Sequence, residues 1–395
     1  MGLTNKCDVI VVGAGPAGST AAKLLADRGY HVLLIDRATF PRHKTCASWI
    51  NRLAFQRFPY LRSRLDELVE APFYGVTFYD HALARAGHFG EAKPSGYLSL
   101  RSRFDDGLRR IAVNAGVEFL GGRGGVNLEE GRDEIRVRLA DGEEFTARVV
   151  VGADGASSRV AVAAGLRKGW QGRDYVLCAN ADIPCDSERI RALYGERFPL
   201  RVYLEYDGIQ GYGWVFPKRR HICVGIGGRM ADNRGIRRLF SKFFRELQEH
   251  GHLPAEMRAE GTTFDIDPVG GVYHLPSVTR GRVMLIGDAA GFVSGSTGEG
   301  IYPGMVSGEV ACETIHRALA RKSAAGGLAN FNRAWRSELA SYVKRLPGGE
   351  QEGKTRGRIE LIFRSPFVAR VAGRIFLYGE RLSVGTLARS LRAWH

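Results

Sequence analysis

Short runs of apolar residues alternate with helical stretches along much of the chain. Residues 8–12 form the first apolar run, residues 19–28 are typical of a helix that ends at Gly29, and residues 32–35 form the next run. Continuous apolar runs of this length indicate strands that are buried on both faces. Strands that alternate with helices in this way predict a parallel sheet covered by helices, which is the α/β class.

A different pattern occupies the middle of the chain. Residues 201–206 and 221–224 alternate between apolar and polar side chains, which indicates strands with one buried face. We therefore expect a mostly antiparallel sheet inserted into the α/β part. Between these segments, Tyr212, Trp214 and Phe216 occupy alternate positions and should lie on one face of a strand. Such a face is either ordinary sheet core or the wall of a binding pocket.

The C-terminal part has the apolar spacing of helices. Residues 326–395 are interrupted by the helix-breaking residues Pro347, Gly348, Gly349 and Pro366. From residue 354 onward, arginines interleave with large apolar side chains, which fits amphipathic helices. Helices of this kind either dock on the protein core or lie on a membrane surface.

The first apolar run leads directly into a glycine-rich turn, residues 13–18. Gly13 permits a tight turn, Gly15 lets the backbone approach a pyrophosphate, and Gly18 allows the next helix to pack closely. The positive end of that helix would face the anion, and Asp36 follows at the spacing expected for a ribose 2′-hydroxyl partner. The turn therefore predicts a dinucleotide site made by Gly13, Gly15, Pro16, Ala17 and Gly18.

Two further motifs indicate which dinucleotide is bound. Residues 282–291 form a strand that runs into a glycine turn with Asp288 at the strand end, and in glutathione-reductase-like flavoproteins this arrangement meets the ribityl chain and pyrophosphate of FAD. Residues 149–159, with Asp154 and Gly155 after an apolar run, resemble the DG motif of the flavin hydroxylase and reductase superfamily. Each segment alone would fit a buried strand with a tight turn. Together, the three motifs predict FAD.

A fourth motif resembles one family of these flavoproteins. Residues 212–217 have the pattern YxWxFP, and a GxG sequence, Gly225-Ile226-Gly227, follows after seven residues. This combination closely resembles the signature of the geranylgeranyl reductase family, whose members hydrogenate isoprenoid carbon–carbon double bonds with reduced FAD. The resemblance extends through almost the whole chain.

The resemblance implies a fold as well as an activity. It implies a Rossmann-like FAD-binding domain of the glutathione-reductase and p-hydroxybenzoate-hydroxylase type, with an inserted antiparallel-sheet substrate domain and a helical C-terminus. Combined with the patterns above, it predicts an FAD-binding domain made of residues 1–72, 98–168 and 276–325. The predicted substrate domain comprises residues 73–97 and 169–275, and residues 326–395 form the helical region.

Individual residues match the cofactor site of the family. Asp36-Arg37 resembles the ribose-contacting acid and its basic neighbour, and Arg101 resembles an arginine that approaches the ribityl or phosphate groups. Residues 287–301 resemble a loop, at a predicted helix start, whose amides meet the N1/O2 edge of the isoalloxazine. The positive helix end there would stabilise the anionic reduced flavin. The FAD-binding residues that the resemblance implies are Asp36, Arg37, Lys44, Thr45, Cys46, Arg101, Asp154, Gly155, Gly287, Asp288, Gly298, Glu299, Gly300 and Ile301.

Cys46 is the best side-chain candidate for the active site. Lys44-Thr45-Cys46 lies where the family usually has Lys-Pro-Cys-Gly before a helix that faces the flavin. An unpaired cysteine can also be inert core. The chain departs from the family where Ala47-Ser48-Trp49 replaces glycines and where residues 292–296 replace an Asn-Pro pair. These departures affect the expected substrate more than the cofactor, because the phosphate and ribityl motifs are intact.

The resemblance implies hydride transfer from flavin N5 to one alkene carbon, with a proton reaching the other carbon from Cys46, Tyr212 or a bound water. An unactivated alkene offers no oxygen on which charge can be stabilised, so a long apolar pocket that excludes water is expected. The external reductant would be NADPH or a reduced ferredoxin-like protein. The predicted lining of the pocket is Tyr212, Trp214, Phe216 and Trp49, with His274 and Tyr302 as weaker candidates.

Three other functions fit parts of the pattern. A flavin monooxygenase shares the three FAD motifs, but the YxWxFP signature speaks against it. A flavin-dependent halogenase is disfavoured because residues 212–217 stand where its WxWxIP motif would be. A membrane-surface or regulatory protein that keeps FAD only as a structural element would bind the cofactor without rapid reduction.

The positive charge of the chain bears on its partners. The formal net charge is +15 over 395 residues. The arginines are spread along the whole chain without a nucleic-acid module, so nucleic-acid binding is not expected. A positive field favours an acidic electron-carrier protein. It also favours peripheral contact with an anionic membrane through the basic C-terminal segment.

The cysteine pattern and the apolar runs bear on compartment and metals. Six cysteines lie without CxxC pairs or histidine partners, so neither a disulfide framework nor a metal site is predicted. No apolar run is long enough to span a bilayer, and the N-terminal run is broken by glycines and lacks a basic leader. We expect a cytoplasmic protein, with peripheral association at the inner membrane face as the alternative.

Overall fold

The computed structural model describes residues 5–172, 174–229, 235–321, 324–343, 359–380 and 382–392. The chain forms two compact units. Unit 1 comprises Met1–His43, Ser102–Tyr175 and Pro268–Arg345, and unit 2 comprises Lys44–Arg101, Val176–Asp267 and Leu346–His395. Residues 44–72, which are predicted to belong to the FAD-binding domain, fall in unit 2. Residues 326–345, which are predicted to belong to the C-terminal helical region, fall in unit 1. The predicted domain limits stay a prediction.

Unit 1 is built on a mainly parallel sheet. Its main path has the order β17-β18-β11-β1-β2-β8, and β10 and β9 extend antiparallel from β11. The predicted apolar runs form the central strands, which are almost entirely buried. The strands are β1 (Lys6–Val12), β2 (Val32–Asp36), β8 (Glu118–Gly121), β9 (Asn127–Glu130), β10 (Ile135–Arg138), β11 (Glu144–Gly152), β17 (Thr279–Arg280) and β18 (Val283–Leu285).

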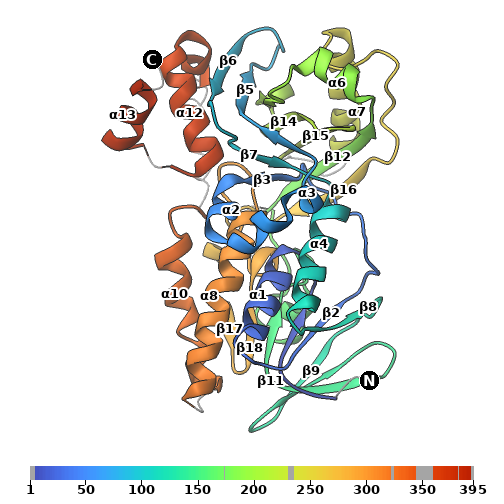
Figure 1. Cartoon of the computed structure of the whole chain (residues 1–395), viewed down its shortest axis with the longest axis vertical. Coiled ribbons are helices and arrows are strands. Elements are labelled where there is room, and N and C mark those ends of the chain that lie inside the picture. The colour runs from blue at the N-terminus through green and yellow to red at the C-terminus, as the bar shows by residue number, and fades with distance from the viewer. Residues whose placement is uncertain are drawn as a thin grey trace. The chain divides into compact units, whose positions relative to one another are not determined.

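Two long helices of unit 1 run side by side next to this sheet, α1 (Pro16–Ala26) and α8 (Ile301–Ala320) (Figure 1). They approach closely because α8 presents glycines: a Cβ on Gly308 would lie 2.7 Å from the carbonyl oxygen of Ala17. The first helix begins three residues earlier than predicted, since Pro16 already has the φ of a first helical residue. The other helices are α4 (Arg101–Asn114), whose first residue belongs to unit 2, α5 (Arg159–Ala163), α9 (Ala324–Leu328) and α10 (Phe331–Leu339).

Unit 2 contains the predicted antiparallel sheet. Its seven strands have the order β16-β12-β15-β14-β13-β5-β6, and only the β13–β5 pair is parallel. The strand predicted at residues 201–206 ends at Leu204 because Glu205 takes a left-handed conformation, with φ of 49°. The strands are β5 (Gly75–Tyr79), β6 (Ala86–Gly90), β12 (Val176–Pro184), β13 (Leu200–Leu204), β14 (Gln210–Pro217), β15 (His221–Arg229) and β16 (Thr263–Asp267).

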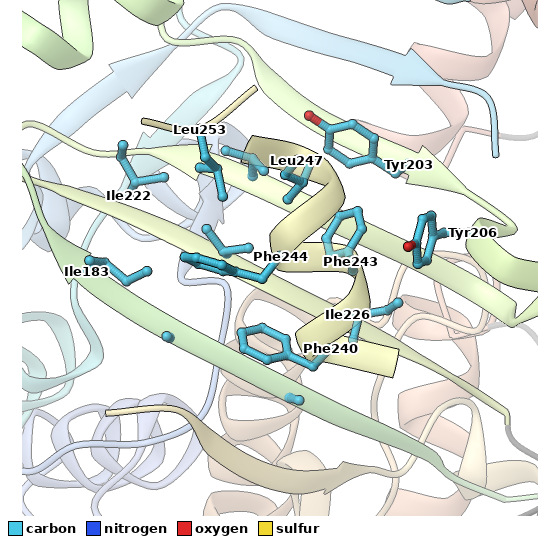
Figure 2. Close-up of a cluster of buried hydrophobic side chains, with 14 of the residues drawn as sticks. Ile183, Tyr203, Tyr206, Ile222, Ile226, Phe240, Phe243, Phe244, Leu247 and Leu253 are labelled. Carbon is cyan, nitrogen blue, oxygen red and sulfur yellow. The ribbon is translucent and has the colours of Figure 1, made fainter. Parts of the chain in front are cut away.

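One face of this sheet is covered by α7 (Gly235–Glu249). Figure 2 shows Phe240, Phe243 and Phe244 of α7 directed at the strands. Burying one such ring contributes about 1.5–3 kcal/mol. The sheet residues in this cluster include Ile183, Tyr203, Ile222 and Ile226, and α6 (Ser187–Tyr194) adds Ile190 and Tyr194.

The opposite face of the sheet carries a second hydrophobic cluster. It joins strand residues to Phe376 of α12 (Pro366–Tyr378) and to a small three-stranded sheet of order β3-β7-β4. The smaller elements are β3 (Trp49–Asn51), α2 (Arg52–Arg57), α3 (Leu65–Leu68), β4 (Ala71–Phe73) and β7 (Gly96–Leu98), with a 3₁₀ turn at Pro59–Arg64. Helix α13 (Val384–Arg392) follows α12.

Of the predicted helix breaks near the C-terminus, the structure describes only the one at Pro366. Pro366 is the first residue of α12, where the Ser365 hydroxyl accepts a hydrogen bond from the Val368 amide. Pro347, Gly348 and Gly349 lie outside the described residues. Within the described ranges, no helix has the length and hydropathy needed to cross a bilayer. In the same ranges, no three His, Cys, Asp or Glu side chains gather in a metal-binding arrangement.

Candidate active site

The first glycine turn is pressed against the turn that follows β11. Gly13 has φ of +106°, and a Cβ there would lie 2.3 Å from the carbonyl oxygen of Ala153. A Cβ on Gly18 would lie 1.8 Å from the carbonyl oxygen of Gly13. Neither position has room for a larger residue, so the spacing of these glycines follows from two close backbone approaches.

Gly15 differs from its two neighbours because its surroundings are open. It precedes α1 as the N-cap with φ of −74°, and no side chain caps the helix. A Cβ on Gly15 would meet only the Arg42 guanidinium, at 3.6 Å. The first amides of α1 are therefore available to an anion at the positive end of the helix. This geometry fits a pyrophosphate.

Arg42 is a candidate that the sequence motifs did not reveal. Its guanidinium lies 3.1 Å from Asp105 Oδ2, and the Asp105 side chain is fully buried. The same guanidinium lies over the Phe40 ring, 5.0 Å from its centre. These contacts hold a positive charge beside the Gly15 turn. Nothing in the sequence distinguishes this arginine from the other basic residues.

Asp36 closes the same site from the end of β2. Its carboxylate is 6% exposed and accepts hydrogen bonds from the amides of Ala14 (2.7 Å) and Ala38 (2.8 Å). A carboxylate has four lone-pair positions, so it can still receive a ribose hydroxyl. Arg37 is exposed to solvent. The predicted ribose contact is compatible with this geometry and stays a prediction.

Asp154 of the third motif has a structural role in the described chain. Its Oδ2 accepts hydrogen bonds from the amides of Arg159 (2.6 Å) and Val160 (3.2 Å), at the start of α5. Burial raises the pKa of this carboxyl group above its ordinary value, against the hydrogen bonds it accepts. The adjacent Gly155 has φ of +79°, and a Cβ there would have no neighbour within 4 Å. Open backbone at Gly155 fits approach of a ligand.

Trp170 joins the second and third motifs, which the sequence did not predict. The Trp170 indole donates a hydrogen bond of 2.8 Å to the carbonyl oxygen of Ala156. A Cβ on Gly291 would lie 2.9 Å from the same ring, so that turn also packs against Trp170. Arg167 lies 3.9 Å over the ring, and burial lowers the pKa of Arg167 to about 10.

The loop before α8 is closed by its own hydrogen bonds. Ser294 donates its amide to the carbonyl oxygen of Glu299 (2.8 Å), and Gly298 takes φ of +69°. The Glu299 side chain is buried and accepts a hydrogen bond from the Tyr342 hydroxyl. Helix α8 begins at Ile301, which confirms the predicted helix start.

The aspartate of the second motif lies against this loop. A Cβ on Gly300 would lie 3.0 Å from Asp288 Oδ1. Gly287 has φ of +57°, and its amide donates to the Ser307 hydroxyl of α8 at 3.0 Å. Gly300, the N-cap of α8, has no side-chain cap, so a second helix N-terminus lies beside Asp288.

Two weaker candidates also lie in unit 1. His274 Nδ1 lies 2.9 Å from Asp174 Oδ1, with both side chains largely buried. This contact fits a structural histidine. Tyr302 packs edge-on against Tyr342, with ring centres 5.4 Å apart.

In unit 2, a tight turn holds Cys46. The Ser48 amide donates to Cys46 Sγ at 3.3 Å, and the Ser48 hydroxyl donates to the Cys46 carbonyl oxygen at 3.2 Å. The buried thiol of Cys223 lies 3.9 Å from the same carbonyl oxygen. Ser48 has φ of +58°, where a glycine would be less strained, and this chain departs here from the glycines usual in the family. The turn keeps Cys46 partly exposed.

Lys44, Thr45 and Arg101, predicted to contact FAD, also belong to unit 2. Lys44 and Thr45 are partly exposed, and Arg101 is buried as the first residue of α4. Their predicted contacts with the cofactor stay predictions.

The three aromatic residues of β14 share one face, as predicted. The ring centres of Tyr212 and Trp214 lie 5.9 Å apart, and those of Trp214 and Phe216 lie 6.5 Å apart. Phe376 of α12 stacks on Trp49 at 6.0 Å and meets Tyr212 edge-on at 5.7 Å. The predicted pocket residues are therefore brought together. They are packed, with Trp214 at 5% and Phe216 at 0% exposure, so their role as a pocket lining stays a prediction.

Glycines on the neighbouring strand make room for Trp214. A Cβ on Gly225 would lie 2.2 Å from Trp214 Cζ2, so the indole lies flat across β15. A Cβ on Gly227 would lie 2.8 Å from Cys178 Sγ. The spacing of the YxWxFP and GxG motifs thus has a direct structural cause.

Comparisons with known proteins agree with this geometry. Residues 6–306 match the family described as FAD binding domain. Menaquinone reductase from Mycobacterium tuberculosis is 31% identical over 346 residues, which cover 81% of this chain and 79% of that protein. Digeranylgeranylglycerophospholipid reductase 2 from Methanopyrus kandleri is 31% identical over 353 residues, 85% of this chain and 84% of that protein.

Solved structures share the fold. A geranylgeranyl bacteriochlorophyll reductase-like protein from Thermoplasma acidophilum superposes with a TM-score of 0.76 at 21% identity, over 98% of this chain and 96% of that one. The flavin-dependent halogenase CmlS has a TM-score of 0.72 at 15% identity, over 99% of this chain and 78% of that one. Likeness at these identities establishes the fold alone.

The motifs, the open helix N-terminus and the matches together define an FAD-dependent oxidoreductase of the p-hydroxybenzoate hydroxylase-like superfamily. Within that class, the chain belongs to the geranylgeranyl reductase family.

Proposed function

We propose that the protein reduces carbon–carbon double bonds in the isoprenoid chain of a hydrophobic substrate. The observation that carries this proposal is the aromatic face of unit 2, where Trp214 lies flat on Gly225 and Tyr212 and Phe216 flank it. The names of the relatives support the proposal, because both menaquinone and digeranylgeranylglycerophospholipid carry polyprenyl chains.

Unit 1 supplies the residues that would hold the pyrophosphate, the ribose and the flavin ring of FAD. The uncapped start of α1 suits the pyrophosphate, Asp36 suits a ribose hydroxyl, and the loop before α8 suits the flavin ring. Once reduced, bound FAD supplies a hydride to the alkene. We propose NADPH or a reduced ferredoxin-like protein as the external reductant, and the net charge of +15 supports an acidic carrier.

The aromatic face and Cys46 perform the remaining tasks. The packed rings of Trp214, Phe216 and Trp49 would form an apolar wall that excludes water from an alkene that has no polar handle. We assign proton delivery to Cys46, whose turn is held by three hydrogen bonds to its sulfur and its carbonyl oxygen. Tyr212 and a bound water are the alternative donors.

An anaerobic half-reaction tests the function. The protein is reduced with stoichiometric dithionite and mixed with geranylgeranyl diphosphate, which has no quinone ring to accept electrons. We expect the oxidised flavin spectrum to return without oxygen and the product to gain two hydrogens by mass spectrometry. Flavin that stays reduced until air is admitted, followed by an oxygenated product, would favour the monooxygenase or halogenase-like alternative.

Substitution of Cys46 tests its assignment. We expect Cys46→Ala to retain FAD and to lower the rate of flavin reoxidation by alkene about 100-fold, as is typical for loss of a general acid. Cys185→Ala is a matched control, since Cys185 is a partly exposed thiol outside the aromatic cluster. Reoxidation of Cys46→Ala at the wild-type rate would remove Cys46 from the mechanism.

We further propose that the C-terminal helices contact an anionic membrane surface where the lipid substrate lies. Leu361 and Leu382 are 49% and 70% exposed, and Arg364 and Arg389 extend into solvent nearby in sequence. Binding to phosphatidylglycerol vesicles should weaken with salt and should be lost in a Leu361→Asp, Leu382→Asp double variant. Equal binding of the variant, or equal binding to phosphatidylcholine vesicles, would contradict this contact.

A further inference from the structure

Arg167 of unit 1 is a buried arginine whose donors are only partly used. The residue is 7% exposed, and its Nη2 donates a hydrogen bond of 2.9 Å to the carbonyl oxygen of Ala156. Among the described residues, no hydrogen-bond partner lies at its buried Nε and Nη1 atoms. A guanidinium carries five N–H donors in a planar fork, so most of this fork is unused. Buried polar atoms without a partner are rare in native proteins and require an explanation.

Another buried arginine of the same unit, Arg282, has partners for its donors. It is 8% exposed, close to the value for Arg167. Its Nη1 donates to the carbonyl oxygen of Arg148 at 3.2 Å, and its Nη2 donates to the carbonyl oxygen of Arg132 at 2.6 Å. These bonds explain Arg282 as a structural residue. Burial by itself therefore does not leave an arginine of this unit with unused donors.

The charge of Arg167 is compensated only in part. Asp154 attracts it electrostatically, but the carboxylate of Asp154 accepts its hydrogen bonds from the Ser158 hydroxyl and from the amides of Arg159 and Val160. Burial lowers the pKa of Arg167 to about 10, against the attraction of Asp154. The guanidinium is still charged at neutral pH, and a nearby anion would stabilise the charged form.

The turn that Arg167 contacts lies against the first glycine turn. Ala156, which accepts the hydrogen bond from Arg167, follows Gly155 in the turn after β11. A Cβ on Gly13 would lie 2.8 Å from Asp154 Cα, so the two turns touch. Gly155 and Ala156 are partly exposed, and a Cβ on Gly155 would have no neighbour within 4 Å. Arg167 thus contacts an open turn that borders the expected pyrophosphate site.

Trp170 provides a fixed platform for Arg167. The guanidinium carbon lies 3.9 Å from the centre of the indole ring, and the indole donates a hydrogen bond of 2.8 Å to the same carbonyl oxygen of Ala156. The ring itself is packed between glycines, since a Cβ on Gly271 would lie 2.5 Å from it and a Cβ on Gly291 would lie 2.9 Å from it. A side chain held in this way loses little entropy when it binds a ligand.

Arg42, the cation beside Gly15, does not supply a net positive charge. Its Nη2 lies 3.1 Å from Oδ2 of the fully buried Asp105 side chain, so the charges of this pair cancel. The N-terminus of α1 contributes about half an elementary charge. The pyrophosphate of a dinucleotide is a dianion, so these groups leave part of its charge without a counter-charge. Arg167 has both the positive charge and the unused donors that such an anion needs.

We propose that Arg167 binds the pyrophosphate of a dinucleotide at the turn of residues 154–156. The planar fork of a guanidinium matches phosphate oxygens in a bidentate arrangement. Two dinucleotides carry this group, FAD itself and a nicotinamide dinucleotide that delivers electrons to it. The first source requires only that the protein binds FAD. The second source rests on the reductant named in the proposed function. Neither source depends on which substrate the flavin reduces.

Arg167→Met separates binding from structure. Methionine removes the charge but keeps a long side chain that packs well on an aromatic ring such as Trp170. We expect the affinity of the full-length apoprotein for FAD, measured by flavin fluorescence, to fall at least about tenfold. Arg167→Lys keeps the charge without the fork and should lie between the two. The apoprotein of Arg167→Met should unfold at no lower temperature than the wild-type apoprotein, because it loses a buried charge with unused donors.

Arg282→Met is the matched control. It removes an equally buried guanidinium from the same unit, but one whose donors serve backbone carbonyl groups. We expect the opposite result, a lower unfolding temperature of the apoprotein with wild-type affinity for FAD. If Arg167→Met instead loses apoprotein stability and FAD affinity together, Arg167 is a structural residue and the proposal is overturned.

A second measurement identifies the source of the pyrophosphate. The FAD-loaded proteins are reduced anaerobically with NADPH, and the half-saturating NADPH concentration is compared. Unchanged FAD affinity in Arg167→Met, with a rise of at least about tenfold in this concentration, would assign the anion to the nicotinamide dinucleotide. Wild-type values in both measurements would overturn the proposal. If NADPH does not reduce the wild type, that reductant fails and the FAD titration alone decides the role of Arg167. Neither measurement uses an alkene, so failure of alkene reduction leaves both intact.

Discussion

Gly15→Ala is expected to abolish tight FAD binding while leaving the apoprotein folded. Gly15 has φ of −74°, which alanine accepts, and its Cβ would meet only the Arg42 guanidinium at 3.6 Å. The added methyl group would stand at the open N-terminus of α1, where the pyrophosphate must approach the backbone. We expect the affinity for FAD to fall at least about 100-fold, which is about 2.7 kcal/mol. Titration of apoprotein with FAD, followed by flavin fluorescence, measures the loss.

The neighbouring glycines provide the contrast. In Gly13→Ala and Gly18→Ala, the new Cβ would lie 2.3 Å and 1.8 Å from backbone carbonyl oxygens, and Gly13 also has φ of +106°. Backbone atoms cannot yield as a flexible side chain can, so these two variants should lose stability as apoproteins by several kcal/mol. Thermal unfolding without FAD separates the two kinds of effect. Wild-type FAD affinity in Gly15→Ala would show that the pyrophosphate does not lie against this turn.

The local architecture of the nucleotide-binding part could be predicted from the sequence, because strand burial and close backbone approaches restrict which residue types can stand there. The runs at β1 and β2 are apolar because both faces of these strands are buried, and the glycines follow from close backbone approaches. The same holds for the aromatic stripe of β14, whose shared face follows from the two-residue period of a strand. The start of α8 at Ile301 was predicted from the resemblance of residues 287–301 to the flavin-binding loop of the family.

Residues that act through tertiary contacts were not predictable. Arg42, Trp170 and Tyr342 reach the FAD motifs from segments without a motif of their own, and Phe376 reaches the aromatic face from the C-terminal helix α12. Their neighbours are distant in sequence, so no local spacing encodes the contact. Ser48 illustrates a second limit, since its left-handed conformation occurs at a residue type that rarely adopts it.

The fold does not separate reductases from their structural relatives. A halogenase structure matches this chain with a TM-score of 0.72, close to the 0.76 of the reductase-like structure. Function must therefore be argued from the site. In this chain the site argument rests on the packing of Trp214 on Gly225, with Cys223 on the same sheet face.

The second large effect is expected from Gly225→Ala. The new Cβ would lie 2.2 Å from Trp214 Cζ2 and 2.3 Å from Trp214 Cε2, so the indole must leave its place on β15. Overpacking of this kind costs about 1–3 kcal/mol of stability. We expect alkene-dependent flavin reoxidation to fall at least about 100-fold, since a small misplacement of a positioning group can have that effect. FAD affinity should not change, because Gly225 is not a predicted FAD contact and the three glycine motifs lie in unit 1.

A double-mutant cycle shows whether the ring itself is the cause. Trp214→Phe removes the part of the indole that the new methyl group would strike, so it should relieve the crowding in Gly225→Ala. The loss of stability in the double variant should therefore be smaller than the sum of the two single losses. Additive losses would mean that the methyl group disturbs the β-ladder and not the indole. Suppose that the coupling is found and that turnover stays low in the double variant, which has no indole. The reaction is then limited by loss of the indole from its place and not by loss of sheet stability.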